Sequence, residues 1–279
     1  MSSSLPPDQY VDSSNLSARA SLHTLYSTNP EGWGHWLFRQ IELEDNLTVL
    51  DVGCGPGELW RRHVDGMPTG CRAVLTDLSP GMISEAEKAL PDDRFDFRVV
   101  DAQELPYPDD HFDSVSANHM LYHVPELDRA LSEIARVLKP QGKLCAATNG
   151  VAHMRQLHDI IRRSVPSFAC LSTSFTLENG QANLERHFGA VSMLRYDDSL
   201  VVPNVSALSA YVRSMGSLAE ATGRQFQEID EAIREQIRRD GSMRIEKATG
   251  LFIAKKPRRA EPTHRPPCRH DTASGHAWR

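Results

Sequence analysis

The segment at residues 49–57, with the sequence VLDVGCGPG, constrains the fold more than any other part of the chain. Its β-branched and aliphatic residues predict a strand that is buried on both faces. Gly53, Gly55 and Gly57 allow a sharp turn and let a ligand approach the backbone closely. The residues after the turn can begin a helix whose free N–H groups point to the same place. The segment therefore predicts a nucleotide-type pocket between a strand and a helix.

Strands and helices alternate regularly through the first half of the chain. Strands are expected at residues 48–52, 73–76, 95–100, 112–118 and 143–148. Helices are expected at residues 58–64, 80–90 and 126–138. Because the connections are short, this alternation predicts an α/β fold with a doubly wound, mostly parallel sheet and right-handed crossovers.

The flanking segments follow other patterns. Residues 15–41 predict two helices separated by a turn at 28–32, and we interpret 15–44 as a helical lid over the pocket. Beyond residue 150, helices are expected at 152–164, 176–188, 205–215 and 220–239, with strand segments at 191–194 and 200–202 and a bent last strand over 242–254. The domain is therefore expected to span 45–256, with substrate-covering insertions near 151–175 and 203–241. Residues 1–14 are expected to be flexible, and 257–279 to form a disordered basic tail.

Charge and composition limit the partners that are expected. The net charge is −6, and the segment from Lys255 onward holds seven Lys or Arg and two acidic residues, which leaves 24 basic and 35 acidic residues elsewhere. An acidic body does not suit a nucleic-acid backbone. No run of about 18 apolar residues could span a membrane. The five scattered cysteines and the absence of a secretion signal favour a cytoplasmic protein with reduced thiols. We expect a monomer or homodimer that acts on a small molecule.

The residues around the turn discriminate between two classes of cofactor. A dinucleotide site needs a small residue where this chain has Glu58, whose charge would also repel a pyrophosphate. Asp51, Asp77 and Asp101 instead stand at the ends of three expected strands. These carboxylates suit an amino-acid ammonium group, a ribose and an adenine amine. The pattern predicts S-adenosylmethionine, which carries no phosphate.

Four ordered motifs resemble those of class I S-adenosylmethionine-dependent methyltransferases. They are residues 49–57, residues 75–82, the segment 101–106 followed by Asp113, and residues 138–144, where Gln141 replaces a glycine. The last two of these motifs are similar to those of the ubiquinone/menaquinone-biosynthesis branch of the family (methyltransferase type 11/25). The resemblance covers about residues 45–150 and implies a seven-stranded sheet of order 3-2-1-4-5-7-6 with the last strand antiparallel.

The same resemblance implies cofactor contacts for individual residues. It places the glycine turn, including Cys54, and Asn118 near the methionine portion, and Asp77 at the ribose. Leu78 and Met82 would flank the adenine, while Asp101 and Ala102 would meet its edge. The implied cofactor-binding residues are Asp51, Gly53, Cys54, Gly55, Gly57, Asp77, Leu78, Met82, Asp101, Ala102 and Asn118.

Histidines after the fourth strand are the candidate catalytic bases. His119 is closest to the strand end, and His123 would share its face if the segment were helical. No third ligand accompanies this pair, so a metal site is not expected. The candidate substrate-binding residues are His23, Tyr26, Trp33, Trp36 and His153.

The predicted activity is methyl transfer to an oxygen, a nitrogen or a carbon of a small metabolite or natural-product intermediate. The alternative is a protein on the same fold that binds S-adenosylmethionine without methylating, as a cyclisation catalyst or a regulatory binder. The cofactor motifs are common to both alternatives, and the acceptor is left open by the sequence.

Overall fold

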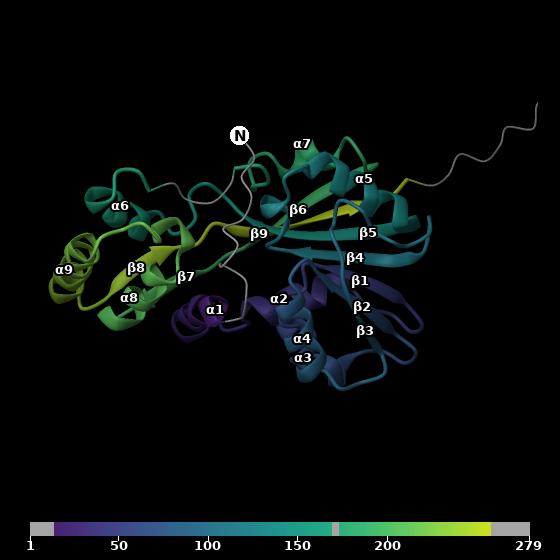
Figure 1. The fold of residues 1–279 in the computed structure, drawn as a ribbon, viewed down its shortest axis with the longest axis horizontal. Helices are drawn as coiled ribbons and strands as arrows, with labels where there is room; N and C mark the ends of the chain where they lie inside the picture. Colours follow the sequence, from purple (N-terminus) through teal and green to yellow (C-terminus); the bar gives the residue numbers. More distant parts are fainter. Residues whose placement is uncertain (1–13, 169–172, 258–279) are drawn as a thin grey trace, which may run out of the picture.

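A seven-stranded sheet forms the centre of the computed structural model, which describes residues 14–168 and 173–257, with side chains from residue 19 (Figure 1). The strand order is β3-β2-β1-β4-β5-β9-β6, and β9 runs antiparallel to both of its neighbours. The strands are β1 (Thr48–Val52), β2 (Arg72–Asp77), β3 (Phe95–Val99), β4 (Phe112–Asn118), β5 (Leu138–Asn149), β6 (Ala190–Tyr196) and β9 (Thr249–Lys255). The predicted fold class and strand order are confirmed.

Helices cover both faces of the sheet. On one face lie α2 (Trp33–Ile41), α3 (Glu58–Arg61) and α4 (Pro80–Ala89), and on the other lie α5 (Leu127–Val137) and α7 (Gly180–Leu184). Ala130, Leu131 and Ile134 bury the apolar stripe of α5 in the largest core cluster, as its helical spacing predicts. Trp60 of α3 lies fully buried on the opposite face. A short turn of 3₁₀ helix, η1 (Val64–Gly66), follows α3.

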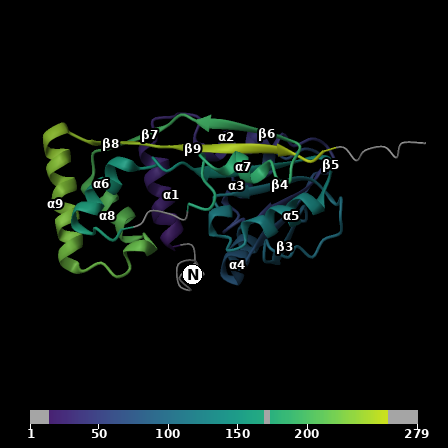
Figure 2. The ribbon, with the colours of Figure 1, turned by 90° about the horizontal axis from the view of Figure 1, so that it is seen from above.

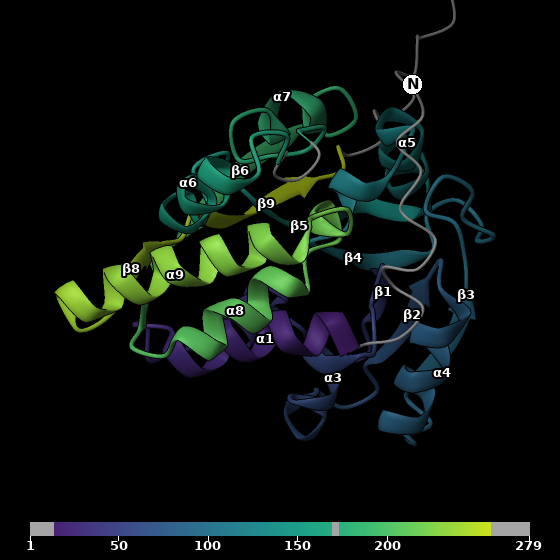
Figure 3. The same ribbon diagram turned by 60° about the vertical axis from the view of Figure 1, so that its left-hand side comes forward.

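A second core lies beside the sheet, in what we call the cap. The cap consists of α1 (Ser14–Tyr26), α6 (Arg155–Ser164), β7 (Ser199–Val202), α8 (Val205–Arg213), η3 (Gly216–Leu218), α9 (Gly223–Asp240) and β8 (Met243–Glu246). Figures 2 and 3 show these elements grouped beyond one end of the sheet, with α1 alongside α8 and α8 alongside α9. Both expected insertions contribute to this core, and so does the N-terminal helix. The expected lid is therefore divided, because α1 packs in the cap and α2 packs on the sheet.

The segment expected to form one bent strand forms two strands in two sheets. β8 pairs with β7 in the cap, whereas β9 pairs with β5 and β6 in the main sheet (Figure 2). Met243 and Ile245 are buried in the cap core, while Phe252 and Ala254 are buried in the sheet core. The short link between them, which includes Lys247, therefore joins the two cores.

Three further expectations are corrected in their boundaries. The helix after the glycine turn ends at Arg61. The helix expected at 176–188 is reduced to α7, because the Asn179 side chain holds the preceding turn through bonds to the Thr176 N–H and the Thr173 carbonyl. Strand β5 begins at Leu138 instead of residue 143. The expected flexible segments 1–14 and 257–279 lie almost entirely outside the described residues.

Replacing Gln141 with glycine should stabilise the folded protein by up to about 1 kcal/mol, because glycine tolerates a left-handed backbone without steric cost. Gln141 has a φ of 71°, at the position where the resembling motif carries a glycine. Urea unfolding of both proteins measures the difference, with Gln103→Gly as a control that should not stabilise. A loss of stability in Gln141→Gly would show that the Gln141 side chain contributes more than its backbone costs.

Candidate functional site

The glycine turn follows β1 and needs glycine at each of its three positions. Gly53, Gly55 and Gly57 have φ values of 69°, 56° and 74°, which L-residues rarely adopt. A Cβ on Gly53 would also lie 2.7 Å from the Cβ of Met120, and one on Gly57 would lie 3.0 Å from a Leu90 methyl carbon. The turn is therefore fixed by its own backbone and by close packing of neighbouring segments.

Asp77 joins this turn to the end of the second strand. Its Oδ2 accepts a hydrogen bond from the Gly55 N–H at 3.0 Å, and its Oδ1 accepts one from the Ser79 N–H at 2.9 Å. Burial raises the pKa of Asp77, while these backbone bonds oppose the shift. The carboxylate thus lies against the turn at the carboxyl edge of the sheet, and its predicted contact with a ribose stays a prediction.

Asp51 has a partner inside the chain that its sequence position does not indicate. It is 2% exposed, and its Oδ2 accepts a hydrogen bond from the Trp60 indole N–H at 2.8 Å. Burial raises the pKa of Asp51 to about 7, against the effect of hydrogen bonds from Trp60 and Ser116. Asp51 therefore anchors α3 beneath the turn. Its predicted contact with a ligand ammonium stays a prediction.

The residues predicted to surround an adenine differ in accessibility. Leu78 is 61% exposed and leaves apolar surface beside Asp77. Val99, which the sequence did not single out, pairs with Asp77 in the sheet and is 51% exposed. Asp101 accepts hydrogen bonds from the Gln103 backbone and side-chain amide. Met82 is buried at 1% exposure and packs inside the protein, and its predicted contact with the adenine stays a prediction. The Ala102 side chain is also buried in the core.

These residues fit a nucleoside ligand better than a phosphate ligand. The turn and the two strand ends beside it present carboxylates and an exposed leucine, and no lysine or arginine lies within residues 49–57 or 75–82. A carboxylate accepts hydrogen bonds from hydroxyl and amine groups, and it repels phosphates. The site therefore has the chemistry that S-adenosylmethionine requires.

His119 lies directly beyond β4 on a strained piece of backbone. Its φ is 55°, and its N–H donates to the Ala147 carbonyl at 3.0 Å, so the chain turns while still attached to β5. Its ring centroid lies 5.3 Å from that of Trp33. Its buried Nδ1 has no hydrogen-bond partner among the described residues. Burial and the charge of Lys247 lower the pKa of His119 to about 4, which keeps the imidazole neutral. Left-handed non-glycine residues cluster at functional sites.

Two other polar residues accompany His119. Asn118 donates from its Nδ2 to the Ser116 hydroxyl, and its buried Oδ1 has no partner among the described residues. His123 ends a separate 3₁₀ turn, η2 (Leu121–His123), so the two histidines do not share a helix face. Burial lowers the pKa of His123 to about 4, and its ring contacts Tyr122.

The ring of His119 lies beside Trp33 of α2 and Tyr122 of η2, and Trp33 belongs to a larger group of aromatic rings. Trp33 contacts Trp36 and Tyr196, with ring centroids 5.3 and 5.2 Å apart, and both tryptophans are partly accessible. The structure therefore brings together most of the predicted substrate-binding residues. Tyr26 is the exception, because it packs on the cap core. No sequence pattern pointed to Tyr196 as part of this group.

Two histidines from distant segments lie on the cap side of the same region. His23 lies 6.0 Å from His153 and 5.8 Å from Tyr211, measured between ring centroids. The His153 Nδ1 lies 3.2 Å from the Thr249 hydroxyl, which in turn donates to Asn149. The buried Nδ1 of His23 has no hydrogen-bond partner in the part of the chain that the structure describes.

A buried ion pair lies beside these rings and was not expected from the sequence. Lys247 Nζ lies 2.5 Å from Asp198 Oδ2, and their side chains are 5% and 0% exposed. The ammonium also lies 5.6 Å from the Tyr196 ring centroid. Asp198 accepts further bonds from the Ser27 hydroxyl and the Thr28 N–H, in the turn between α1 and α2. No local sequence signal pairs residues from these three segments.

The buried histidines should make the protein less stable as the pH falls from 6.5 toward 4. Burial lowers the pKa of His119 and His158 to about 4 and that of His23 to about 3. In this interval the unfolded chain takes up protons that the folded chain does not, so protonation favours unfolding. Asp51 acts in the opposite direction, because its raised pKa lets the folded state bind a proton below pH 7.

Thermal melts at pH 7.5 and 5.0 measure this effect, with a lower melting temperature expected at pH 5.0. His158→Asn should make the pH dependence shallower, whereas substitution of the exposed His111 should leave it unchanged. A melting temperature that rises between pH 6.5 and 5.0 would contradict the prediction.

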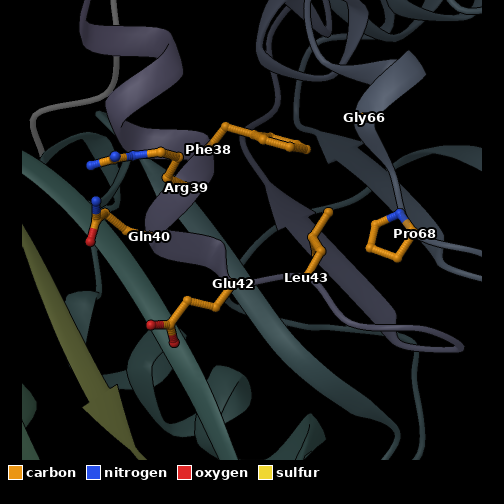
Figure 4. A pocket seen from close by; sticks show the side chains of 7 residues that line it. All are labelled: Phe38, Arg39, Gln40, Glu42, Leu43, Gly66 and Pro68. Carbon is orange, nitrogen blue, oxygen red and sulfur yellow. The ribbon is translucent and has the colours of Figure 1, made fainter. Parts of the chain in front are cut away.

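A surface pocket lies at the other end of β1. It is lined by Phe38, Arg39, Gln40, Glu42, Leu43, Gly66 and Pro68 (Figure 4). These residues precede the amino ends of β1 and β2, whereas the glycine turn follows the carboxyl end of β1. The pocket contains none of the predicted site residues, so it takes no part in the site described above. Within residues 14–168 and 173–257, no helix is long and apolar enough to cross a membrane, and no group of three or more His, Cys, Asp or Glu could hold a metal ion.

The part of the chain that contains the glycine turn and His119 is similar to known proteins. Residues 50–146 match a family model described as a methyltransferase domain. The methyltransferase GfsG of Streptomyces halstedii is 33% identical over 146 residues, which cover 51% of each chain. The ubiquinone/menaquinone biosynthesis C-methyltransferase UbiE of Laribacter hongkongensis is 36% identical over 117 residues, 40% of this chain and 47% of that protein. The chain thus spans about half the length of these relatives.

A solved structure shares the fold over a larger part of the chain. It is a phosphoethanolamine N-methyltransferase of Haemonchus contortus in complex with S-adenosyl-L-methionine, at 20% identity and a TM-score of 0.58. The match covers 91% of this chain and 59% of that one. At this identity the likeness shows a common fold.

Proposed function

We propose that the chain carries a class I methyltransferase domain of the ubiquinone/menaquinone-biosynthesis-like branch and transfers a methyl group from S-adenosylmethionine to a small metabolite or natural-product intermediate. The match of residues 50–146 to a methyltransferase domain and the similarity to curated methyltransferases support this proposal. One observation carries the proposal. The turn that fits the nucleoside and the histidine that fits a base lie on neighbouring segments, since Met120, the residue after His119, lies so close to Gly53 that a Cβ on that glycine would come within 2.7 Å of the Met120 Cβ. Cofactor and acceptor would therefore meet at the carboxyl edge of β1 and β4.

Individual residues would hold the cofactor in this arrangement. Asp77 would accept the ribose hydroxyls, Leu78 would cover one face of the adenine, and Asp101 would lie at its edge. Gly55 and Asn118 would border the methionine portion. The Asn118 Oδ1, which has no partner within the described part of the chain, can accept from an ammonium group. When bound, the cofactor supplies an electrophilic methyl carbon for in-line displacement.

His119 is the base that the geometry favours for an acceptor that must lose a proton. Its neutral imidazole and unpaired Nδ1 can take that proton, and Trp33 limits the directions from which an acceptor approaches. General-base catalysis typically contributes about 10²- to 10⁴-fold to a rate. His123 lies farther along the chain, in η2, and would assist by contact with the acceptor.

Binding and transfer are tested separately. Calorimetric titration with S-adenosylmethionine and S-adenosylhomocysteine tests the cofactor, and transfer from methyl-labelled cofactor into an extract of small molecules tests the reaction. His119→Ala should reduce transfer about 100-fold or more while leaving the affinity for S-adenosylhomocysteine within about threefold. His111→Ala, at the opposite end of β4, is the matched control.

The outcomes separate the two functions considered for this fold. If neither cofactor form binds, the proposal fails entirely. If both bind and no label is transferred to any small molecule, the alternative of a non-methylating enzyme or a regulatory binder is favoured.

A further inference from the structure

The basic side chains between the cap and the sheet are not needed to hold the cofactor. His23 comes from α1, His119 follows β4, His153 follows β5, and Lys247 lies between β8 and β9. We call these four residues the basic cluster. Ring contacts link them across four separate segments. His23 lies beside His153, His119 lies beside Trp33, and Lys247 lies over the Tyr196 ring, which also contacts Trp33. His119 is the base in the proposed function, so the acceptor would lie next to this cluster. Their chemistry therefore bears on which acceptors can enter.

Lys247 gives the basic cluster a fixed positive charge. Its side chain is 5% exposed and is held by the ion pair with Asp198 and by the Tyr196 ring. The ammonium acts on all three histidines, because its charge lowers the pKa of His23, His119 and His153. Asp198 opposes that effect at His23. At His119 and His153 the ion pair thus presents its positive end.

The three histidines are neutral and retain hydrogen-bonding capacity. Burial lowers the pKa of each, most strongly for His153 and His23. The Nδ1 atoms of His23 and His119 are buried and have no partner among the described residues. A neutral imidazole offers one donor and one acceptor nitrogen. The region therefore combines one fixed cation with uncommitted groups that can bond a hydroxyl.

A cationic acceptor is disfavoured in this region. The carboxylate paired with Lys247 is Asp198, which also accepts from Ser27, Thr28 and Asn29. A second ammonium would meet the charge of Lys247 at low local dielectric, beside a carboxylate whose oxygens already accept other hydrogen bonds. An oxygen that becomes negative during the reaction would be stabilised by the same charge.

Building on the proposed methyl transfer, we propose that the basic cluster selects an acceptor with an acidic hydroxyl, a phenol or enol, and that Lys247 stabilises the negative charge on its oxygen. The hydroxyl proton passes to the Nδ1 of His119. The oxygen then bonds to the methyl carbon as the carbon–sulfur bond breaks, and that electron pair stays on sulfur, which converts the sulfonium to a thioether. Trp33 and Trp36 provide partly accessible ring surface for an aromatic or conjugated acceptor.

Three probes with one ring system test the charge preference. Binding of 2-naphthol, 2-naphthoate and 2-naphthylmethylammonium to the full chain at pH 7.5 is measured by tryptophan fluorescence, with and without saturating S-adenosylhomocysteine. We expect 2-naphthol and 2-naphthoate to bind at least tenfold more tightly than the ammonium probe. In the Lys247→Met/Asp198→Asn double variant, this preference should fall to threefold or less. Removing both charges together avoids leaving one buried charge unpaired.

A second ion pair supplies the matched control. Lys256→Met/Asp110→Asn removes a partly buried pair at the opposite edge of the sheet and should leave the tenfold preference unchanged. Thermal melts verify that both double variants fold, and Lys247→Arg, which keeps the charge, should retain the preference.

Several results would overturn the proposal. One is that the ammonium probe binds as tightly as 2-naphthol and 2-naphthoate, or more tightly. Another is that neither 2-naphthol nor 2-naphthoate binds detectably. A third is that the Lys247→Met/Asp198→Asn variant keeps the tenfold preference. Titration of S-adenosylhomocysteine in the same samples distinguishes this failure from failure of the proposed function, because loss of cofactor binding concerns only the methyl transfer.

Discussion

Replacement of Asp77 by alanine is expected to weaken binding of S-adenosylhomocysteine by about 100-fold or more. A hydrogen bond to a charged group contributes about 1.5–3 kcal/mol, and the carboxylate would accept two from the ribose. The substitution also removes the bonds that fix the Gly55 and Ser79 N–H groups, so the glycine turn loses its anchor on β2. Isothermal titration calorimetry of the purified protein measures the change directly.

Asp96→Ala is the matched control for this prediction. Asp96 lies on the neighbouring strand β3, where it forms an exposed ion pair with Arg98 and faces no part of the site. Its substitution should change the affinity by less than about twofold, as expected for an exposed pair. A loss of less than tenfold for Asp77→Ala would argue against ribose binding at the end of β2.

Replacement of Asp198 by alanine is expected to destabilise the protein by about 3–5 kcal/mol, the cost of leaving one partner of a buried ion pair unpaired. Lys247 would keep a buried charge without a counter-ion. The turn between α1 and α2 would also lose its bonds from the Ser27 hydroxyl and the Thr28 and Asn29 N–H groups. Urea or guanidinium unfolding, monitored by circular dichroism, measures the loss.

The surface pair Asp159–Arg162 provides the comparison. Both side chains are about half exposed, so Asp159→Ala should cost less than about 1 kcal/mol. The Lys247→Met/Asp198→Asn double variant should be clearly more stable than Asp198→Ala, because no unpaired charge remains. If Asp198→Ala costs no more than Asp159→Ala, the buried pair does not hold the cap to the sheet.

The sheet and the cofactor side of the site were accessible from the sequence because their signals are local. A strand, a turn and a helix follow one another within a few residues. Because strands and helices alternate along the chain, the strands that they connect are expected to run parallel. Asp77 and Asp101 stand at strand ends, so any parallel sheet brings them to one edge. Even in this part of the protein, the sequence did not predict how side chains of different elements pack together. The hydrogen bond between Trp60 and Asp51 and the burial of Met82 depend on side chains that meet only after helices dock.

The acceptor side could be predicted only in part. His119 was found because it follows a strand, and Trp33 because it precedes the first strand in a helical pattern. Lys247 gave no such signal, since the sequence around it predicted a bend in one strand. The structure shows a link between two sheets there. Asp198, the partner of Lys247, is 49 residues from it in the sequence. Ser27, which donates to Asp198, is 171 residues from Asp198.

The sequence by itself therefore determined the class of fold and the carboxylate chemistry expected at the cofactor turn, because both are encoded in short runs of residues whose backbone preferences and periodicity act locally. The strand order followed from the resemblance of four motifs to a known family, since local patterns do not fix which strands are neighbours. Only the tertiary structure decided that the N-terminal helix joins the cap and that three histidines and Lys247 face one region. Those contacts arise when separate apolar faces bury each other, and burial of the charged and polar groups then sets their protonation and their partners.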